Sequence, residues 1–211
     1  MENLKQLIGG YHQFRSSIYL KHDDTYKKLA KYGQSPKVMI IGCIDSRVDP
    51  TTIFNARPGE LLIVRNVANI VPPLEEHNNR DSMAAALQFG VEVIGVKLIV
   101  VLGHALCGGV ASFLANNDQN IPDNQFIRPW ISLLVSAKNE LSCTENEVNK
   151  EKLCRALELQ SIKQSIKNLN TYPFIKDQFE RKKLKLEGAY FDVSMGELLV
   201  LNNQSGKYEK V

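Results

Sequence analysis

Two short segments of the chain carry residue types that bind soft metal ions: GCIDSR at 42–47 and GHALCGG at 103–109. Two thiolates and an imidazole, from Cys43, Cys107 and His104, form a borderline-soft donor set that suits Zn²⁺. His104 and Cys107 are three residues apart, so a helical turn would point both side chains the same way. If the two segments meet, three protein ligands leave a fourth tetrahedral position, which is typical of a catalytic zinc site.

The residues that follow Cys43 decide whether such a site is open. Asp45 can fill the fourth position itself and shut the site. Arg47 can instead hold Asp45 away from the metal as a bidentate ion pair, which leaves the position to water. The sequence leaves both arrangements open. Taken alone, Asp45 and Arg47 would be interpreted as a plain loop salt bridge.

Other chemistries compete with a catalytic metal. A lone cysteine at the end of a strand is usually a small buried hydrophobe. A thiol enzyme with Cys43 as its nucleophile is a further class. However, the 43–47 segment lacks the longer loop of amide donors found in cysteine phosphatases, and the chain contains no Cys-x-x-Cys. The combination of both segments favours the metal, and metal analysis separates the two classes.

Size and charge bound the class of protein. The 211 residues suit one large domain, and 26 Lys and Arg against 23 Asp and Glu give a net charge of +3. This balance is too even for a nucleic-acid or membrane-surface binder. The sequence has no run of about 18 uncharged apolar residues and no signal-peptide core at its start. We therefore expect a cytoplasmic protein that binds neither nucleic acid nor membrane.

The four cysteines are too few for a disulfide scaffold. Cys143 and Cys154 have no histidine or second cysteine at ligand spacing. We interpret both as structural or surface thiols, which leaves Cys43 and Cys107 for the chemistry.

The elements that must position these residues follow from the apolar pattern. Three short runs are apolar on both faces, which is typical of buried strands; they lie at 38–41, 61–64 and 98–102. A largely buried helix is expected at 82–95, with Asp81 or Ser82 as its cap. Buried strands alternating with helices predict an α/β fold, a mostly parallel central sheet flanked by helices. Ligands bind beyond the carboxyl ends of such strands, where both metal-type segments lie.

The two ends of the chain add further elements. Residues 1–32 are expected to form an N-terminal helical arm of one or two helices, with a kink or a break at Gly9-Gly10. Its apolar stripe must pack either on its own domain or on a second subunit. Residues 33–211 then form a single α/β zinc-enzyme domain. Near the C-terminus, 189–193 and 198–201 predict a hairpin that adds an antiparallel edge strand.

Between them, the polar stretch 116–129 is expected to be a loop. The pattern Thr144-x-x-Glu147 is a capping box that predicts the start of a long helix, which runs to about Leu169. One face of this helix is apolar and carries Leu153, Leu157, Ile162, Ile166 and Leu169.

Three motifs together resemble the β-class carbonic anhydrases: CxDSR at 43–47, RNxAN at 65–69 and HxxCG at 104–108. The similarity runs from about 33 to 110 and resumes at the terminal hairpin. It implies a zinc enzyme that reversibly hydrates carbon dioxide to bicarbonate and a proton through a zinc-bound hydroxide. It also implies a mostly parallel α/β fold and a homodimer or dimer-based tetramer, with the site near the subunit interface.

Carried over residue by residue, the resemblance implies three metal ligands, which are Cys43, His104 and Cys107. It implies a catalytic dyad of Asp45 and Arg47. It also implies four substrate-binding residues, which are Gln34, Leu62, Val67 and Phe89.

The same resemblance points to one branch of the family. Gln34, nine residues before Cys43, matches the glutamine that hydrogen-bonds substrate in the plant-type branch. The branch whose zinc is closed off by aspartate usually has a tryptophan three residues before the first cysteine, where this chain has Ile40. We therefore expect the plant-type, open-site form.

The chain also departs from the plant-type pattern. Tyrosine and histidine are common four residues apart on the helix before the third strand, and here those positions hold Phe89 and Val93. The residue that passes the proton to buffer is therefore not identified. Two alternatives stay open: a related zinc hydrolase acting on COS or CS₂, and a zinc-binding interaction protein without turnover.

Overall fold

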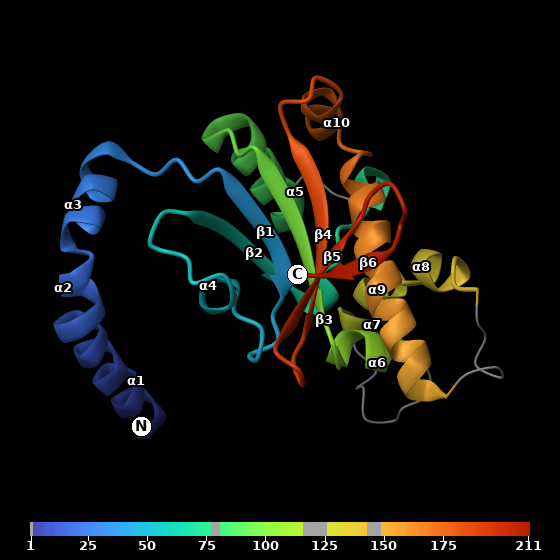
Figure 1. The fold of residues 1–211 in the computed structure, drawn as a ribbon, viewed down its shortest axis with the longest axis horizontal. Helices are drawn as coiled ribbons and strands as arrows, with labels where there is room; N and C mark the ends of the chain where they lie inside the picture. The colour runs from blue at the N-terminus through green and yellow to red at the C-terminus, as the bar shows by residue number, and fades with distance from the viewer. Residues whose placement is uncertain (1, 77–80, 116–125, 143–148) are drawn as a thin grey trace.

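A single six-stranded sheet organises the computed structural model, which describes residues 2–76, 81–115, 126–142 and 149–211 (Figure 1). The strand order is β2-β1-β3-β4-β5-β6, with parallel pairing from β2 to β4 and antiparallel pairing from β4 to β6. The expected α/β fold is thereby confirmed, and β6 is an edge strand that the sequence analysis missed. The strands are β1 Val38–Cys43, β2 Leu61–Asn66, β3 Leu98–His104, β4 Lys185–Asp192, β5 Glu197–Leu201 and β6 Tyr208–Lys210.

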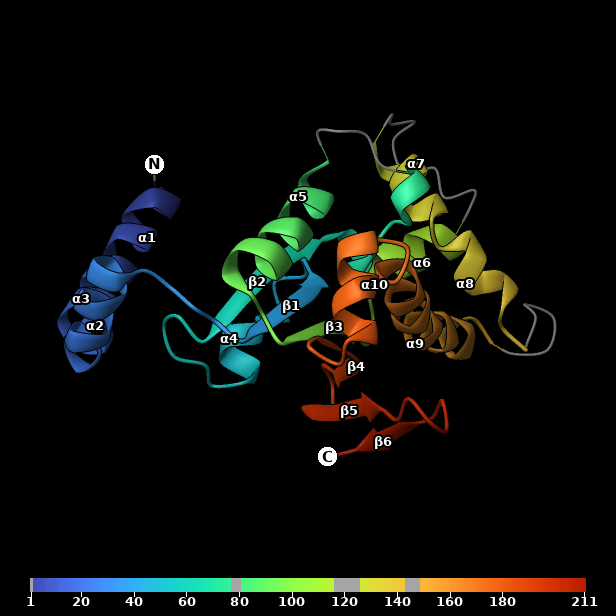
Figure 2. The ribbon, with the colours of Figure 1, turned by 90° about the horizontal axis from the view of Figure 1, so that it is seen from above.

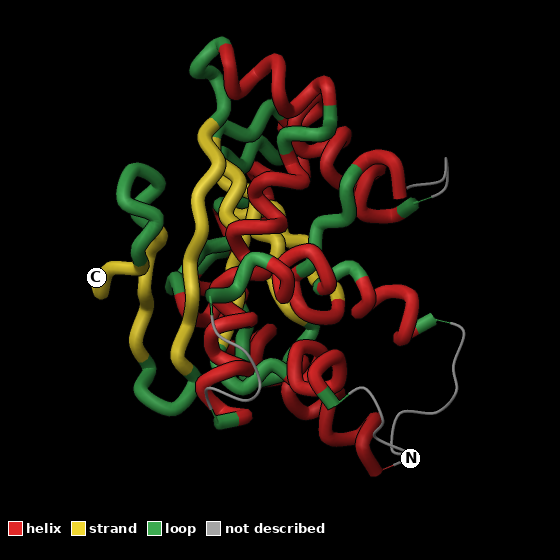
Figure 3. Tube along the Cα trace, turned by 90° about the vertical axis from the view of Figure 1, so that its right-hand side faces the viewer, coloured by secondary structure: helices red, strands yellow, loops and turns green. Residues whose placement is uncertain are grey.

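The helices lie mainly on one side of this sheet (Figure 3). The α-helices are α1 Glu2–Gln13, α2 Tyr19–Lys21, α3 Asp23–Tyr32, α4 Pro50–Ile53, α5 Ser82–Gln88, α6 Gly108–Leu114, α7 Ile127–Ser132, α8 Val135–Asn139, α9 Lys150–Leu169 and α10 Pro173–Glu180. Within the described ranges, π-helical turns lie at Phe14–Ile18 and Phe89–Ile94, and 3₁₀ turns lie at Val67–Asn69 and Leu74–Glu76.

The central strands are buried on both faces, as their apolar runs predict. Met39 and Ile41 of β1 contribute to the main core, which α5, α9 and α10 cover (Figure 2). Ile40 and Leu102 belong to a smaller cluster of their own. Side chains alternate between the faces of a strand, so each central strand supplies both clusters. This packing fixes the register that places the strand ends side by side.

The N-terminal arm stands away from the sheet (Figures 1 and 2). Of the kink or break expected at Gly9-Gly10, the break is absent: α1 runs through both glycines, because glycine inside a helix costs only about 1 kcal/mol and does not end it. The helix changes instead at the π-helical turn 14–18, where the Ser17 hydroxyl donates to the Gln13 carbonyl at 2.6 Å.

The apolar stripe of this arm does not pack on its own sheet. Its members are exposed, and they include Leu4, Leu7, Ile8, Tyr11 and Ile18. One contact with the rest of the chain is made by Leu29 of α3, which lies against the turn at Gly59. The sequence left open whether this stripe packs on its own domain or on a second subunit. Within the described residues, its own domain does not cover it.

Two other expectations changed at element boundaries. The expected loop 116–129 ends earlier, because α7 begins at Ile127; its residues 116–125 lie outside the described residues. The capping box Thr144 to Glu147 also lies outside them. The long helix begins at Lys150, where Asn149 is the cap and accepts the Lys152 N–H at 2.9 Å, and it ends at Leu169 as predicted.

Candidate metal centre

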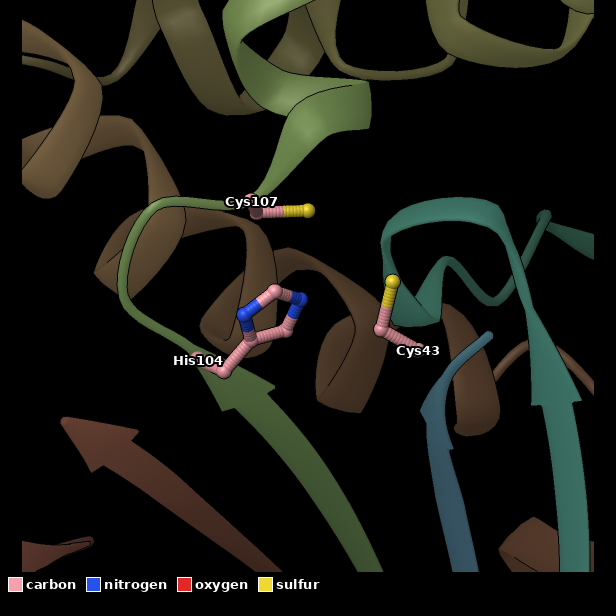
Figure 4. Close-up of side chains that lie close together, drawn as sticks. All are labelled: Cys43, His104 and Cys107. Atoms are coloured by element: carbon pink, nitrogen blue, oxygen red, sulfur yellow. The ribbon is translucent and has the colours of Figure 1, made fainter. Parts of the chain in front are cut away.

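The carboxyl ends of β1 and β3 lie side by side, because the two strands are parallel neighbours. Cys43 is the last residue of β1, His104 is the last residue of β3, and Cys107 caps α6 three residues later. All three are buried, and their ligand atoms lie within 4.8 Å of one another. Figure 4 shows both sulfur atoms and the imidazole ring around one space. The structure thus brings together the three residues that the sequence singled out as metal ligands.

The imidazole of His104 is oriented for a metal. Its Nδ1 lies 2.8 Å from the Ala105 carbonyl oxygen, which only accepts, so Nδ1 carries the hydrogen. The other nitrogen, Nε2, then presents a lone pair. It is buried and has no hydrogen-bond partner among the described residues. Metal-binding histidines are commonly held by such a bond to a backbone carbonyl, so the unpartnered nitrogen fits a bound cation.

The two thiols shift each other's pKa in opposite directions. A hydrogen bond from Cys107 lowers the pKa of Cys43, and the backbone N–H groups of Asp45 and Ala68 act in the same direction. The same contact, with burial, raises the pKa of Cys107. A divalent cation would supply the positive charge that lets both sulfurs ionise together.

Asp45 is held by Arg47. Arg47 donates from Nε to Oδ1 at 2.9 Å and from Nη2 to Oδ2 at 2.8 Å, and its backbone N–H also reaches Oδ1 at 3.0 Å. These bonds hold the pKa of Asp45 well below its usual range, although burial acts to raise it. Of the two arrangements that the sequence left open, the structure has the bidentate pair.

Arg65 clamps the loop that carries this pair. Its Nε donates to the Cys43 carbonyl at 2.7 Å, and its Nη2 donates to the carbonyls of Asp45 at 2.6 Å and Val48 at 3.1 Å. Sequence reasoning noted Arg65 within a motif and gave it no role. One feature could have indicated this role: Arg65 lies one residue before the end of β2, next to the strand that ends in Cys43.

The segment after β2 is strained and braced. Ala68 and Asn69 both have left-handed backbone angles, with φ of 62° and 47°, which non-glycine residues rarely adopt. The Asn66 side chain accepts the Ile70 N–H at 3.0 Å and donates to its carbonyl at 2.8 Å. Trp130 donates from Nε1 to the Val67 carbonyl at 2.8 Å. These bonds hold the Ala68 N–H toward Cys43.

The four residues expected to bind substrate do not gather at one place within the chain. Val67 follows β2 directly and packs against the buried cluster that contains Cys43 and Cys107. Leu62 pairs with Met39, four residues before Cys43, which is about 13 Å along the strand. The neighbour of Phe89, Gly90, packs on Leu62 and Met39 as well.

Gln34 is exposed and precedes the amino end of β1, whereas Cys43 ends that strand. A single chain therefore places Gln34, Leu62 and Phe89 toward the amino ends of the strands and places the metal-type residues at the carboxyl ends. Cys154 is a half-buried free thiol. Cys143 lies outside the described residues.

Comparison with known proteins decides the family. The carbonic anhydrase family model matches residues 38–198. Beta carbonic anhydrase 3 of Arabidopsis thaliana is 34% identical over 197 residues, which cover 93% of this chain and 76% of that protein. The chain belongs to the β-class carbonic anhydrases. It is therefore a lyase of a metalloenzyme family, and these relatives fit the plant-type branch.

Further relatives of this β-carbonic anhydrase agree. Beta carbonic anhydrase 6, mitochondrial, of Arabidopsis thaliana is 36% identical over 182 residues; the match covers 86% of this chain and 62% of that protein's length. The solved structure of the β-carbonic anhydrase CcaA superposes with a TM-score of 0.93 at 27% identity, covering all of this chain and 93% of that one. A tetrameric β-carbonic anhydrase of Sordaria macrospora gives a TM-score of 0.83 at 26% identity, with 96% and 98% covered.

The helices of this carbonic anhydrase were compared with the length and apolar composition of a membrane-spanning helix. Within the described ranges, none of them combines the length and the apolar composition needed to cross a bilayer.

Proposed function

We propose that this carbonic anhydrase reversibly hydrates carbon dioxide to bicarbonate and a proton at a Zn²⁺ held by Cys43, His104 and Cys107. The observation that carries the proposal is the buried Cys-His-Cys group beside an ionised Asp45 that Arg47 holds in a bidentate pair. Two sulfurs and one imidazole nitrogen suit zinc, and three protein ligands leave one position for solvent.

A bound Zn²⁺ would lower the pKa of a coordinated water to about 7, so that a nucleophile exists at neutral pH. The residues of the chain then orient the attack. Ionised Asp45 accepts a hydrogen bond from the attacking water, which aims an oxygen lone pair at carbon dioxide. Arg47 keeps Asp45 ionised and fixes its plane. Val67 packs against the buried cluster that contains Cys43, and there it would contribute an apolar wall that suits an apolar substrate.

We further propose that the site is completed by a second copy of the chain. Gln34, Leu62 and Phe89 lie at the opposite strand ends from the metal centre of their own chain, so they can reach a metal centre only in another subunit. The apolar side chains of the arm are exposed, and a structurally similar β-carbonic anhydrase is described as tetrameric. In this assembly Gln34 would donate its amide hydrogen to the substrate oxygen that gains charge. We expect a homodimer or dimer-based tetramer in the cytoplasm.

Stopped-flow carbon dioxide hydration with parallel zinc analysis tests the proposal. The purified protein is expected to hold about one zinc per chain and to lose activity when a chelator removes it. Asp45→Asn is expected to keep the zinc and lose the activity. A metal-free chain that is fully active would contradict the proposal. It would favour the alternative in which the Cys43 thiol is a nucleophile.

A further inference from the structure

Glu158 is a buried carboxylate that reaches the metal centre from a distant helix. It lies in α9, 51 residues after Cys107, and only 4% of its surface is exposed. Its Oε1 accepts the Cys107 N–H at 2.9 Å, and its Oε2 accepts the Tyr190 hydroxyl at 2.8 Å. Burying a carboxylate is costly unless hydrogen bonds compensate, so its placement here calls for a reason.

The bond to Cys107 holds one particular peptide group. The N–H of Cys107 and the carbonyl of Leu106 belong to the same peptide plane. That carbonyl accepts a hydrogen bond from Nη2 of Arg47 at 3.0 Å. Glu158 and Arg47 therefore hydrogen-bond to opposite sides of the Leu106–Cys107 peptide group, Glu158 at its N–H and Arg47 at its carbonyl.

This peptide needs external support. Leu106 has φ of 59°, a left-handed conformation that costs a residue with a side chain about 1 kcal/mol or more. On the Glu158 side, a cavity of about 480 Å³ borders Leu106, Cys107 and Tyr190. The cavity leaves this side of the peptide without dense packing, so the hydrogen bond from Cys107 to Glu158 is a contact that holds it there.

We infer that Glu158 is a positioning residue, which orients the Leu106–Cys107 peptide so that its carbonyl anchors Arg47 and, through Arg47, fixes Asp45. The inference rests on the proposed roles of Asp45 and Arg47. It differs from a purely structural tie between α9 and the sheet, because it places the effect of Glu158 on the geometry of Arg47.

Three substitutions separate these roles. Glu158→Gln keeps an oxygen for the Cys107 N–H and an amide that can donate to the Tyr190 oxygen, so it preserves the support. Glu158→Leu has a similar volume and removes the support. Glu158→Asp keeps the carboxylate but shortens the side chain by one methylene, which moves the carboxylate away from the Cys107 N–H. This variant takes the place of Glu158→Leu if the leucine variant does not fold.

Each variant is assayed for zinc content, for kcat and KM of carbon dioxide hydration, and for the ¹⁵Nε–¹H resonance of Arg47 in metal-free protein. We expect Glu158→Leu or Glu158→Asp to keep zinc, to lose about 10- to 100-fold in kcat/KM and to shift the Arg47 resonance. Glu158→Gln is expected to stay within about threefold of wild type.

The inference is overturned if the leucine or aspartate variant leaves the Arg47 resonance and the activity unchanged. It is equally overturned if Glu158→Gln loses as much activity as the variant without support, because the negative charge would then matter rather than the hydrogen bond. Wild-type protein that shows no hydration activity would refute the proposed function, and the Arg47 resonance would still report on Glu158.

Discussion

Two adjacent glycines at the start of α6 offer a matched test of how tightly the metal centre is packed. A Cβ atom added at Gly109 would lie 2.8 Å from Val67 Cγ1 and 2.9 Å from Ala68 Cβ, both closer than real Cβ contacts. At Gly108 a Cβ would meet nothing within 4 Å. Gly109→Ala must therefore push the strained 67–69 segment, which carries the N–H aimed at Cys43, whereas Gly108→Ala need not.

The size of the effect follows from these contacts. Overpacking of a rigid core costs about 1–3 kcal/mol. Alanine in place of glycine gains at most about 1 kcal/mol in a helix, and both variants share that gain. We therefore expect Gly109→Ala to be less stable than Gly108→Ala by about 1–3 kcal/mol.

Denaturant unfolding of both variants gives this difference, and carbon dioxide hydration per bound zinc gives the effect on the site. Activity should fall in Gly109→Ala and stay near wild type in Gly108→Ala. Equal stability and equal activity of the two variants would refute the close packing of Val67 and Ala68 on α6.

Three further predictions concern the residues around the centre. Asp45→Asn should lower kcat/KM by about 10²- to 10³-fold while zinc content measured by emission spectroscopy stays constant, since removing one preorganised hydrogen-bonding group from a reacting centre costs about that much; an equally active variant contradicts its role. Because the pKa of Asp45 is lowered in the folded chain, its pair with Arg47 adds stability above the ordinary aspartate pKa of about 4, and this stability is lost as pH falls through the folded value. The free energies of unfolding of wild type and Asp45→Asn should accordingly differ by a constant amount above about pH 4, and this difference should shrink at lower pH. A difference that grows on acidification would contradict a stabilising Asp45–Arg47 pair. Co-expressed Asp45→Asn and Gln34→Ala chains should recover about a quarter of wild-type activity, because half of randomly formed dimers are mixed and each mixed dimer has one intact site; no recovery would place Gln34 in the site of its own chain.

The metal-type residues were accessible to sequence reasoning because their positions follow from local rules. Cys43 and His104 end apolar runs that read as buried strands, and parallel neighbours end at the same edge of a sheet. The capping of α5 by Asp81 is equally local, and the structure bears it out with bonds from the N–H groups of Met83 and Ala84.

What the sequence did not reveal depends on contacts between distant segments. In the sequence, nothing distinguishes Glu158 from other residues of its helix. Only the fold brings it to the Cys107 N–H. The close approach that requires glycine at Gly109 involves a segment some 40 residues earlier. The separation of Leu62 and Phe89 from the metal centre follows from which end of the sheet each occupies. Motif spacing alone does not give that position.

The coordination of the metal is the most direct test of the whole account. X-ray absorption at the zinc edge of the purified protein is expected to show two sulfur ligands at about 2.3 Å, one histidine nitrogen at about 2.0–2.1 Å and one further light atom. The double variant Cys43→Ser, Cys107→Ser should lose these sulfur contributions and the bound zinc. A protein without zinc, or zinc with a ligand set that survives loss of both cysteines, would contradict the account.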